Sequence, residues 1–191
     1  MTPPDGTTSD DAALARARAE MARLVVEVPD FPEPGIVFRD ITPLLADARG
    51  LAAVVEALAE AGRAGGRPVV DAVAGMESRG FILGAPVALA LGVGFVPVRK
   101  AGKLPRPTHA VTYDLEYGSA TLELHRDALA PGQRVLLVDD VLATGGTAVA
   151  TRQLVESCGA TAHGLAVLME LEFLAGRDKL DGLDLTVLET V

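Results

Sequence analysis

The segment VLLVDDVLATGGT, residues 135–147, decides the fold class of this chain and most of its chemistry. It begins as a short apolar run of the kind that forms a buried strand in a parallel sheet. Asp139 and Asp140 come where that strand is predicted to end, and TGGT then opens a predicted helix over 147–157. Ligands of open α/β folds bind beyond the carboxyl ends of the strands. The sequence therefore predicts a binding site at this junction.

The residue types at the junction indicate the chemistry of the ligand. Backbone N–H groups and hydroxyls of TGGT, at a helix N-terminus, form a cradle for an anion such as phosphate. Carboxylates repel phosphate, so the two aspartates suit sugar hydroxyls or a divalent metal that bridges to phosphate. Together these features favour a ribose phosphate. The alternative is a plain strand, polar turn and capped helix. GxxxxGK[ST] and GxGxxG after a strand are both missing, which disfavours a nucleoside-triphosphate loop and a dinucleotide fold.

Outward from this segment, predicted strands alternate with predicted helices. A disordered tail is expected over residues 1–10, and the remainder, 11–191, is expected to be a single domain. The predicted helices cover about 11–26, 50–61 and 79–91; the predicted strands cover about 69–74, 94–98, 134–140, 161–169 and 184–188, with a β-hairpin over 111–125. This alternation predicts an α/β fold with a mainly parallel sheet.

Composition excludes several classes of function. Of 191 residues 49% are hydrophobic, which is typical of a folded chain, while the net charge of −9 and the 4% of aromatic residues argue against a nucleic-acid binder. Cys158 is the only cysteine, so an internal disulfide is impossible. The apolar stretch 81–98 contains prolines and glycines, which favours a buried helix and strand over a membrane span. We therefore expect a cytoplasmic protein with no membrane partner.

Charge is unevenly distributed along the chain. No acidic residue occurs from 78 to 113, a window that holds five cations: Arg79, Arg99, Lys100, Lys103 and Arg106. This window indicates either a local anion site or a chance effect of the apolar stretch, and charge alone leaves both open.

Longer motifs carry a resemblance to a known family. VLLVDDVLATGGT resembles the phosphoribosyl diphosphate (PRPP) loop of the type I phosphoribosyltransferases. The segments VPDFPEPGIVFRDITPLL (28–45), GMESRGFILGAPVALALGVGFVPVRKAGKLP (75–105) and YDLEYGSATLELHRDAL (113–129) are similar, in order, to the adenine-specific family among them. The resemblance covers about residues 28–180. It implies a mainly parallel central sheet flanked by helices, a small N-terminal hood of about 11–45, and a mobile catalytic hairpin loop.

The resemblance also implies a reaction and its partners. Adenine and PRPP would give AMP and diphosphate, in a homodimer. Mg²⁺ would be held mainly through the substrate diphosphate and ribose, with no dedicated set of protein ligands. Two alternatives are a transferase for another purine, such as hypoxanthine or guanine, and a non-catalytic PRPP-sensing regulator. The regulator is disfavoured because only about 27 residues precede VPDFP, too few for a DNA-binding domain.

Site residues follow from the resemblance, position by position. The ribose would be held by Asp139 and Asp140, and the 5′-phosphate by Ala143, Thr144, Gly145, Gly146 and Thr147. The diphosphate would be bound by Glu77, Ser78, Arg79, Lys100, Lys103 and Tyr117, with a non-proline cis peptide at Glu77–Ser78. Glu116 would handle the purine proton as the catalytic acid/base, and Arg79 is the second predicted catalytic residue. Adenine would be read by the backbone of Val37 and Arg39 and covered by Phe38 and Leu171.

The same residues also have ordinary structural interpretations. Phe38 and Leu171 could be plain core packing, the lysines could be solvated, and Glu116 could be an exposed hairpin carboxylate. The chain also departs from the family pattern after GKLP, where Arg106, Pro107, Thr108 and His109 replace the usual glycine. This departure is predicted to stiffen the loop and to add a cation.

Overall fold

The computed structural model describes residues 9–114 and 118–191. The predicted tail therefore lies almost wholly outside the described residues, and so do the predicted site residues Glu116 and Tyr117. The chain divides into two compact units, Met1–Ala57 and Leu58–Val191, and each is described by itself. The single-domain boundaries expected from the sequence stay a prediction.

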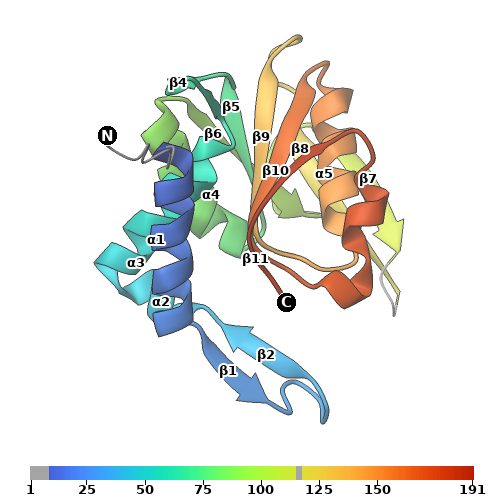
Figure 1. Cartoon of the computed structure of the whole chain (residues 1–191). Helices are drawn as coiled ribbons and strands as arrows, with labels where there is room; N and C mark the ends of the chain where they lie inside the picture. The colour runs from blue at the N-terminus through green and yellow to red at the C-terminus, as the bar shows by residue number, and fades with distance from the viewer. Residues whose placement is uncertain (1–8, 115–117) are drawn as a thin grey trace, which may run out of the picture. The chain divides into compact units, whose positions relative to one another are not determined.

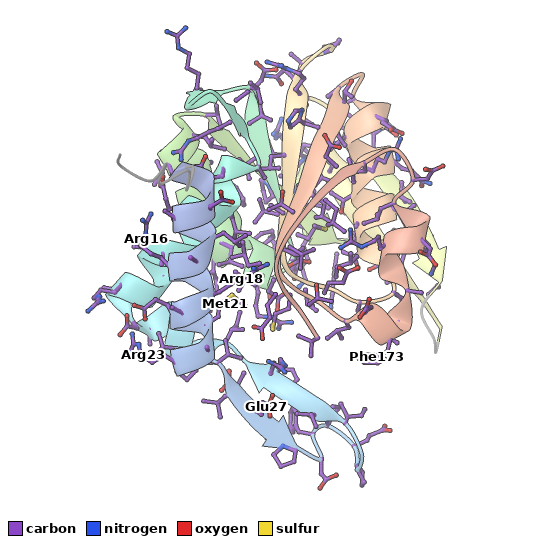
Figure 2. All side chains as sticks on the ribbon, in the orientation of Figure 1. Arg16, Arg18, Met21, Arg23, Glu27 and Phe173 are labelled. Atoms are coloured by element: carbon purple, nitrogen blue, oxygen red, sulfur yellow. The ribbon has the colours of Figure 1, made fainter. Side chains whose placement is uncertain are left out.

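The first unit consists of short helices and a two-stranded hairpin. Its elements are α1 (Ser9–Leu24), β1 (Val26–Pro29), β2 (Val37–Asp40), α2 (Thr42–Ala46) and the start of α3 (Ala48–Glu60). Strands β1 and β2 pair antiparallel, and neither was predicted as a strand. Helix α1 buries Ala13, Ala17 and Met21, which recur every four residues, while Arg16 and Arg23 are exposed (Figure 2).

The second unit is built on a seven-stranded sheet in the order β11-β10-β9-β5-β6-β8-β7 (Figure 1). Its strands are β5 (Ala72–Met76), β6 (Gly94–Lys100), β7 (Thr108–Asp114), β8 (Ser119–His125), β9 (Arg134–Leu142), β10 (Thr161–Glu170) and β11 (Asp184–Thr190). The five strands from β11 to β6 are parallel, whereas β8 pairs antiparallel with both β6 and β7. A small separate hairpin joins β3 (Arg63–Ala64) to β4 (Arg67–Pro68). The predicted α/β fold with a mainly parallel sheet is confirmed.

Two helices link the parallel strands on either side of the sheet (Figure 1). Helix α4 (Arg79–Leu91) leads from β5 to β6, whereas α5 (Gly146–Ser157) leads from β9 to β10 in the opposite direction along the sheet. Connections between parallel strands are almost always right-handed, so two crossovers that run in opposite directions along the sheet place their helices on opposite faces. The strand order thus reverses between β5 and β9, and such a switch point is where open sheets bind ligands.

Glycines allow α4 to lie unusually close to the sheet at this switch point. A Cβ on Gly80 would lie 2.6 Å from the carbonyl oxygen of Val138 in β9. A Cβ on Gly75, in β5, would overlap the carbonyl oxygen of Gly80. Neither position admits a side chain without movement of the backbone. The first turn of α4 therefore sits directly against the end of β5 and the middle of β9.

Most predicted elements of the second unit occur where the sequence placed them. The predicted helix over 79–91 is α4, and its end is set by Gly92, which adopts the left-handed conformation at φ +69°. The strand predicted over 69–74 is displaced to β5, and the strand predicted over 134–140 extends two residues further in β9. Stretch 81–98 divides between α4 and β6, as predicted. Within the described residues, no helix combines the length and apolarity needed to cross a membrane.

Candidate functional site

A cavity of about 420 Å³ opens at the switch point of the sheet in the second unit. Elements β5, α4, β9 and α5 each contribute residues to its wall. The predicted site residues that line it are Glu77, Ser78, Arg79, Lys100, Asp139, Asp140, Ala143, Thr144, Gly145, Gly146 and Thr147. Residues 60 or more positions apart in the sequence thus meet around one space, as the strand–helix topology predicted.

One wall of the cavity is the loop between β9 and α5. Gly145 caps α5 in the left-handed conformation, at φ +79°, and the helix begins at Gly146. The first N–H groups of a helix have no partner within it, and its dipole favours an anion there. The segment 143–147 therefore offers N–H groups and the hydroxyls of Thr144 and Thr147 to the same small volume. This geometry suits a phosphate monoester.

A second loop braces this phosphate cradle from behind, and sequence reasoning missed it. A Cβ on Gly145 would lie 2.6 Å from the carbonyl oxygen of Gly176, and a Cβ on Gly176 would overlap the carbonyl oxygen of Ala143. The buried Gly176 begins the 3-10 turn η2 (Gly176–Lys179), in the connection from β10 to β11. The only local signal was the glycine itself in LAGRD, and its contact partner is more than 30 residues away.

An ion pair fixes the bracing turn to the sheet. Arg177 Nε donates to Glu170 Oε1 at 2.9 Å and its Nη2 donates to Oε2 at 2.5 Å, in a bidentate pair. Glu170 is the last residue of β10 and is 4% exposed, while the Arg177 side chain is about half exposed. Hydrogen bonding to Glu170 raises the pKa of Arg177. The ion pair, between residues seven positions apart, therefore holds Gly176 against the segment 143–147.

The two aspartates of β9 have different surroundings. Asp140 is buried and accepts a hydrogen bond from Arg79 Nε. This hydrogen bond joins a residue predicted to bind ribose to a residue predicted to bind diphosphate. Asp139 Oδ1 accepts a hydrogen bond from the N–H of Asp140 at 2.9 Å. Burial raises the pKa of the Asp139 carboxyl well above its usual range, and the neighbouring charge of Asp140 adds to the rise.

Glu77, which follows β5, interacts with three cationic residues at the end of β6 and just beyond it. Its carboxylate accepts hydrogen bonds from Lys103 Nζ at 2.5 Å and from the N–H of Lys100 at 2.9 Å, and Arg99 Nε lies 3.5 Å away. The hydrogen bond from Lys103 is the main cause that lowers the pKa of Glu77, although burial opposes it. The Glu77–Ser78 peptide is cis, which confirms the expectation from the resemblance. Lys103 reaches the cavity wall through Glu77, since it does not line the cavity itself.

The β7–β8 hairpin forms a further wall of the cavity. Tyr113, in β7, lines the cavity, and its hydroxyl lies 2.9 Å from Thr147 Oγ1 in the cradle. Sequence reasoning assigned no role to Tyr113. The predicted catalytic residue Glu116 and the predicted diphosphate-binding residue Tyr117 lie outside the described residues, so their roles stay predictions.

The segment 106–109, which departs from the family pattern, is held by contacts with the residues that follow β8. Arg106 pairs with Asp127, the N–H of Arg126 donates to the carbonyl of Pro107 at 3.1 Å, and Arg126 Nε donates to the carbonyl of Thr108 at 3.0 Å. These three contacts lie at the open end of the hairpin, where Thr108 pairs with His125. The added cation is therefore neutralised by Asp127, and the segment is held at both ends.

The predicted adenine residues are divided between the two units. Val37, Phe38 and Arg39 belong to β2 in the first unit. The ring of Phe38 contacts Phe31 edge-on, at 5.3 Å between centroids, and Val37 is 56% exposed. Leu171 belongs to the second unit and follows β10 directly, without lining the cavity. The joint role of these residues in binding adenine stays a prediction.

Metal-binding capacity in the site rests on oxygen atoms alone. In residues 9–114 and 118–191, no three His, Cys, Asp or Glu side chains are grouped so that they could hold a metal ion. Asp139 and Asp140 both line the cavity, and carboxylate oxygens are ligands that Mg²⁺ prefers. The site therefore fits an ion that arrives with an oxygen-rich ligand.

Comparison with known proteins agrees with this geometry. The phosphoribosyl transferase domain family matches residues 42–190. An adenine phosphoribosyltransferase of Nocardioides sp. (strain ATCC BAA-499 / JS614) is 70% identical over 174 residues, covering 91% of this chain and 94% of its own.

Solved structures give the same result. That of the adenine phosphoribosyltransferase from Thermoanaerobacter pseudethanolicus is 51% identical, with a TM-score of 0.85 over 91% of this chain and 99% of its own. The Saccharomyces cerevisiae enzyme, solved with D-2,5-dideoxy-2,5-imino-altritol 1,6-bisphosphate and adenine, is 41% identical, with a TM-score of 0.84 over 91% and 99% of the two chains. Family match, sequence identity and fold all converge: the chain belongs to the phosphoribosyltransferases and, among them, to the adenine phosphoribosyltransferase family.

Proposed function

We propose that this protein transfers the 5-phosphoribosyl group of PRPP to adenine and releases AMP and diphosphate, a step of purine salvage. The observation that carries the proposal is the single cavity in which a phosphate cradle, two aspartates and an arginine meet. In the reaction the bond from the ribose anomeric carbon to diphosphate breaks, and a bond from the same carbon to adenine forms. Diphosphate leaves with the bonding electron pair.

The phosphoribosyl end of the substrate is assigned to β9 and α5. The 5′-phosphate would accept hydrogen bonds from the segment 143–147 at the N-terminus of α5. Asp139 and Asp140 would accept hydrogen bonds from the two ribose hydroxyls, which no phosphate oxygen could provide. Binding at both ends would fix the anomeric carbon over the cavity, and such positioning supplies a large part of enzymatic rate enhancement.

The diphosphate end is assigned to the residues after β5 and at the end of β6. Arg79 would stabilise the negative charge that builds up on the leaving diphosphate, together with Lys100 and Lys103. The backbone N–H group of Ser78 would contribute, since Ser78 lines the cavity, whereas the N–H of Glu77 donates to the carbonyl oxygen of Val98 at 3.1 Å. Such donors act mainly by stabilising charge in the transition state.

Proton handling is assigned to Glu116, and the adenine ring to the residues that the family resemblance implies for it. Adenine must lose a proton as it bonds to the ribose, and a positioned carboxylate contributes about 10²–10⁴-fold to such a step. Tyr117 would contact the diphosphate. The backbone of Val37 and Arg39 would read the edge of adenine, with Phe38 and Leu171 on its faces.

Mg²⁺ completes the proposed chemistry. It would be held mainly by diphosphate and ribose oxygens, with the carboxylates of Asp139 and Asp140 nearby. When bound, the ion neutralises charge on the diphosphate and so improves it as a leaving group. We further propose a cytoplasmic homodimer; the exposed Ile82 and Leu89 on α4 are apolar residues suited to a subunit contact. A mass from light scattering tests the dimer.

The deciding experiment is formation of AMP from adenine and PRPP, followed by chromatography with and without Mg²⁺. We expect AMP and diphosphate in equal amounts, and loss of both when a chelator removes the metal. A folded protein that forms no AMP would refute the proposal. Competition among adenine, hypoxanthine and guanine then tests base choice, and a preference for either of the other purines would reassign the substrate. Tight PRPP binding without turnover would instead support a PRPP-sensing regulator.

A further inference from the structure

The contact between Tyr113 and Thr147 links two parts of the chain that the proposed reaction uses separately. Tyr113 lies in β7 of the hairpin, and Thr147 lies in the first turn of α5, in the phosphate cradle. Their oxygen atoms are 2.9 Å apart, and both residues line the cavity. The Tyr113 side chain packs against the buried core of the second unit, and this packing restrains the position of its hydroxyl.

The chemistry of the ligand decides which hydroxyl donates. A phosphate monoester at neutral pH offers acceptor oxygens, so Thr147 must donate its one proton to the phosphate. The remaining lone pairs of Thr147 Oγ1 are then acceptors, and the Tyr113 hydroxyl must be the donor. A chain of hydrogen bonds would run from Tyr113 through Thr147 to the phosphate, and each bond in such a chain strengthens the next.

We propose that Tyr113 is a positioning residue for the 5′-phosphate: its hydroxyl donates to Thr147 Oγ1 and turns the Thr147 proton toward the ligand. This inference rests on the proposed function, because it takes segment 143–147 as the 5′-phosphate site. Tyr113 touches no reacting atom in this proposal and acts only through Thr147. It would make phosphate recognition depend on the β7–β8 hairpin.

The test is a double-mutant cycle on Tyr113 and Thr147, with ribose 5-phosphate and inorganic diphosphate as calorimetric probes. Tyr113→Phe keeps the ring and removes the hydroxyl, and we expect ribose 5-phosphate to bind about 2–10-fold more weakly, the effect of one hydrogen bond. Diphosphate should bind as in the wild type. In a Thr147→Val background, Tyr113→Phe should have no further effect on ribose 5-phosphate binding.

A matched control is available on the same hairpin. Thr112 Oγ1 and Thr121 Oγ1 form an exposed hydroxyl pair at 2.8 Å, away from the cavity wall, so Thr112→Val removes a comparable hydrogen bond. It should leave the affinity for ribose 5-phosphate unchanged. Thermal melts of all variants establish that each is folded at the temperature of the calorimetry.

Each other outcome overturns the inference. If Tyr113→Phe binds ribose 5-phosphate as tightly as the wild type, the hydroxyl has no role. If Tyr113→Phe weakens diphosphate equally, or weakens ribose 5-phosphate as much in the Thr147→Val background, the tyrosine acts through general structure. Failure of the proposed function is distinct, because the wild type would then form no AMP, whether or not it binds ribose 5-phosphate. A wild type that does not bind ribose 5-phosphate would overturn the inference as well.

Discussion

Gly80→Ala tests whether the site depends on the close approach of α4 to β9. Gly80 follows Arg79 in the first turn of α4, and a Cβ at this position would lie 2.6 Å from the carbonyl oxygen of Val138 and 3.1 Å from Asp139 Oδ1. Both neighbours belong to the strand that carries the two aspartates. The substitution therefore changes the spacing between Arg79 and the aspartates without altering any charged group.

The size of the effect follows from these distances. Backbone oxygens essentially never approach a Cβ within 3.0 Å, so α4 and β9 must separate by at least 0.4 Å, and by 0.8 Å for an ordinary contact at 3.4 Å. A misplacement of about 1 Å in a catalytic site costs on the order of 10²-fold in rate. We expect kcat/KM for PRPP to fall by roughly 10-fold to 10²-fold. Overpacking of this kind also costs about 1–3 kcal/mol of stability.

The assay is AMP formation at varied PRPP, with a thermal melt of the same sample. Gly84→Ala is the matched control, because Gly84 lies on the same helix and its Cβ would meet chiefly the ring of Phe95, which can turn aside. We expect Gly84→Ala to keep kcat/KM within about 2-fold of the wild type, since helix propensity favours alanine. A folded Gly80→Ala enzyme with unchanged kcat/KM would refute the reasoning, as would an equal loss in Gly84→Ala.

Four further predictions concern carboxylates. Because the pKa of Asp139 is raised in the folded protein, the stability linked to its proton is present below the ordinary pKa and lost as pH rises through the raised one. Asp139→Asn should thus raise the Tm of the ligand-free protein at pH 7, by about 2–4 °C per kcal/mol regained, and Asp139→Asn with Asp140→Asn should weaken PRPP binding in calorimetry; a lower Tm or an unchanged affinity contradicts these assignments. Glu116→Gln should lower kcat by about 10²–10⁴-fold with little change in PRPP affinity, whereas equal losses in both would show that Glu116 positions substrate. Glu170→Gln should weaken the pair with Arg177, lower the free energy of unfolding in urea by about 1–3 kcal/mol and raise KM for PRPP, and an unchanged KM would show that the bracing turn does not position the cradle.

Helices, strands and turns that are determined by neighbouring residues in the chain could be predicted from the sequence. Helix α4 ends at Gly92 because only a residue tolerant of positive φ closes a helix in this way, and that signal is a single letter. The β9–α5 junction was predictable for the same reason, since an apolar run, two acids and TGGT occur in one segment of 13 residues. The β1–β2 hairpin was missed because prolines and a glycine between Pro29 and Gly35 obscured the two short strands that flank them.

Contacts between distant segments could not be predicted, because they depend on how the strands are ordered. The sequence around Gly176 does not indicate that a Cβ at this position would overlap the backbone of Ala143. Nor does the sequence around Tyr113 indicate that its hydroxyl reaches Thr147, 34 positions away. A pattern of residues fixes which face of an element is apolar, whereas the partner across the sheet is set by topology. The supports of the site therefore became visible only in the folded chain.

The acid-free window from 78 to 113 illustrates the same limit for charge. By sequence its cations indicated either an anion site or chance, yet four of them form ion pairs with carboxylates from outside the window. These pairs are Arg79–Asp140, Arg99–Glu77, Lys103–Glu77 and Arg106–Asp127. A diphosphate that binds Arg79 and Lys103 must therefore replace or share a carboxylate at each of them. Its binding free energy at each cation is the gain from the new ion pair minus the loss of the existing one. This net gain is small for a single phosphate group and grows when several phosphate oxygens are bound at once. The pairing thus favours a ligand held at both ends of the cavity over a free anion.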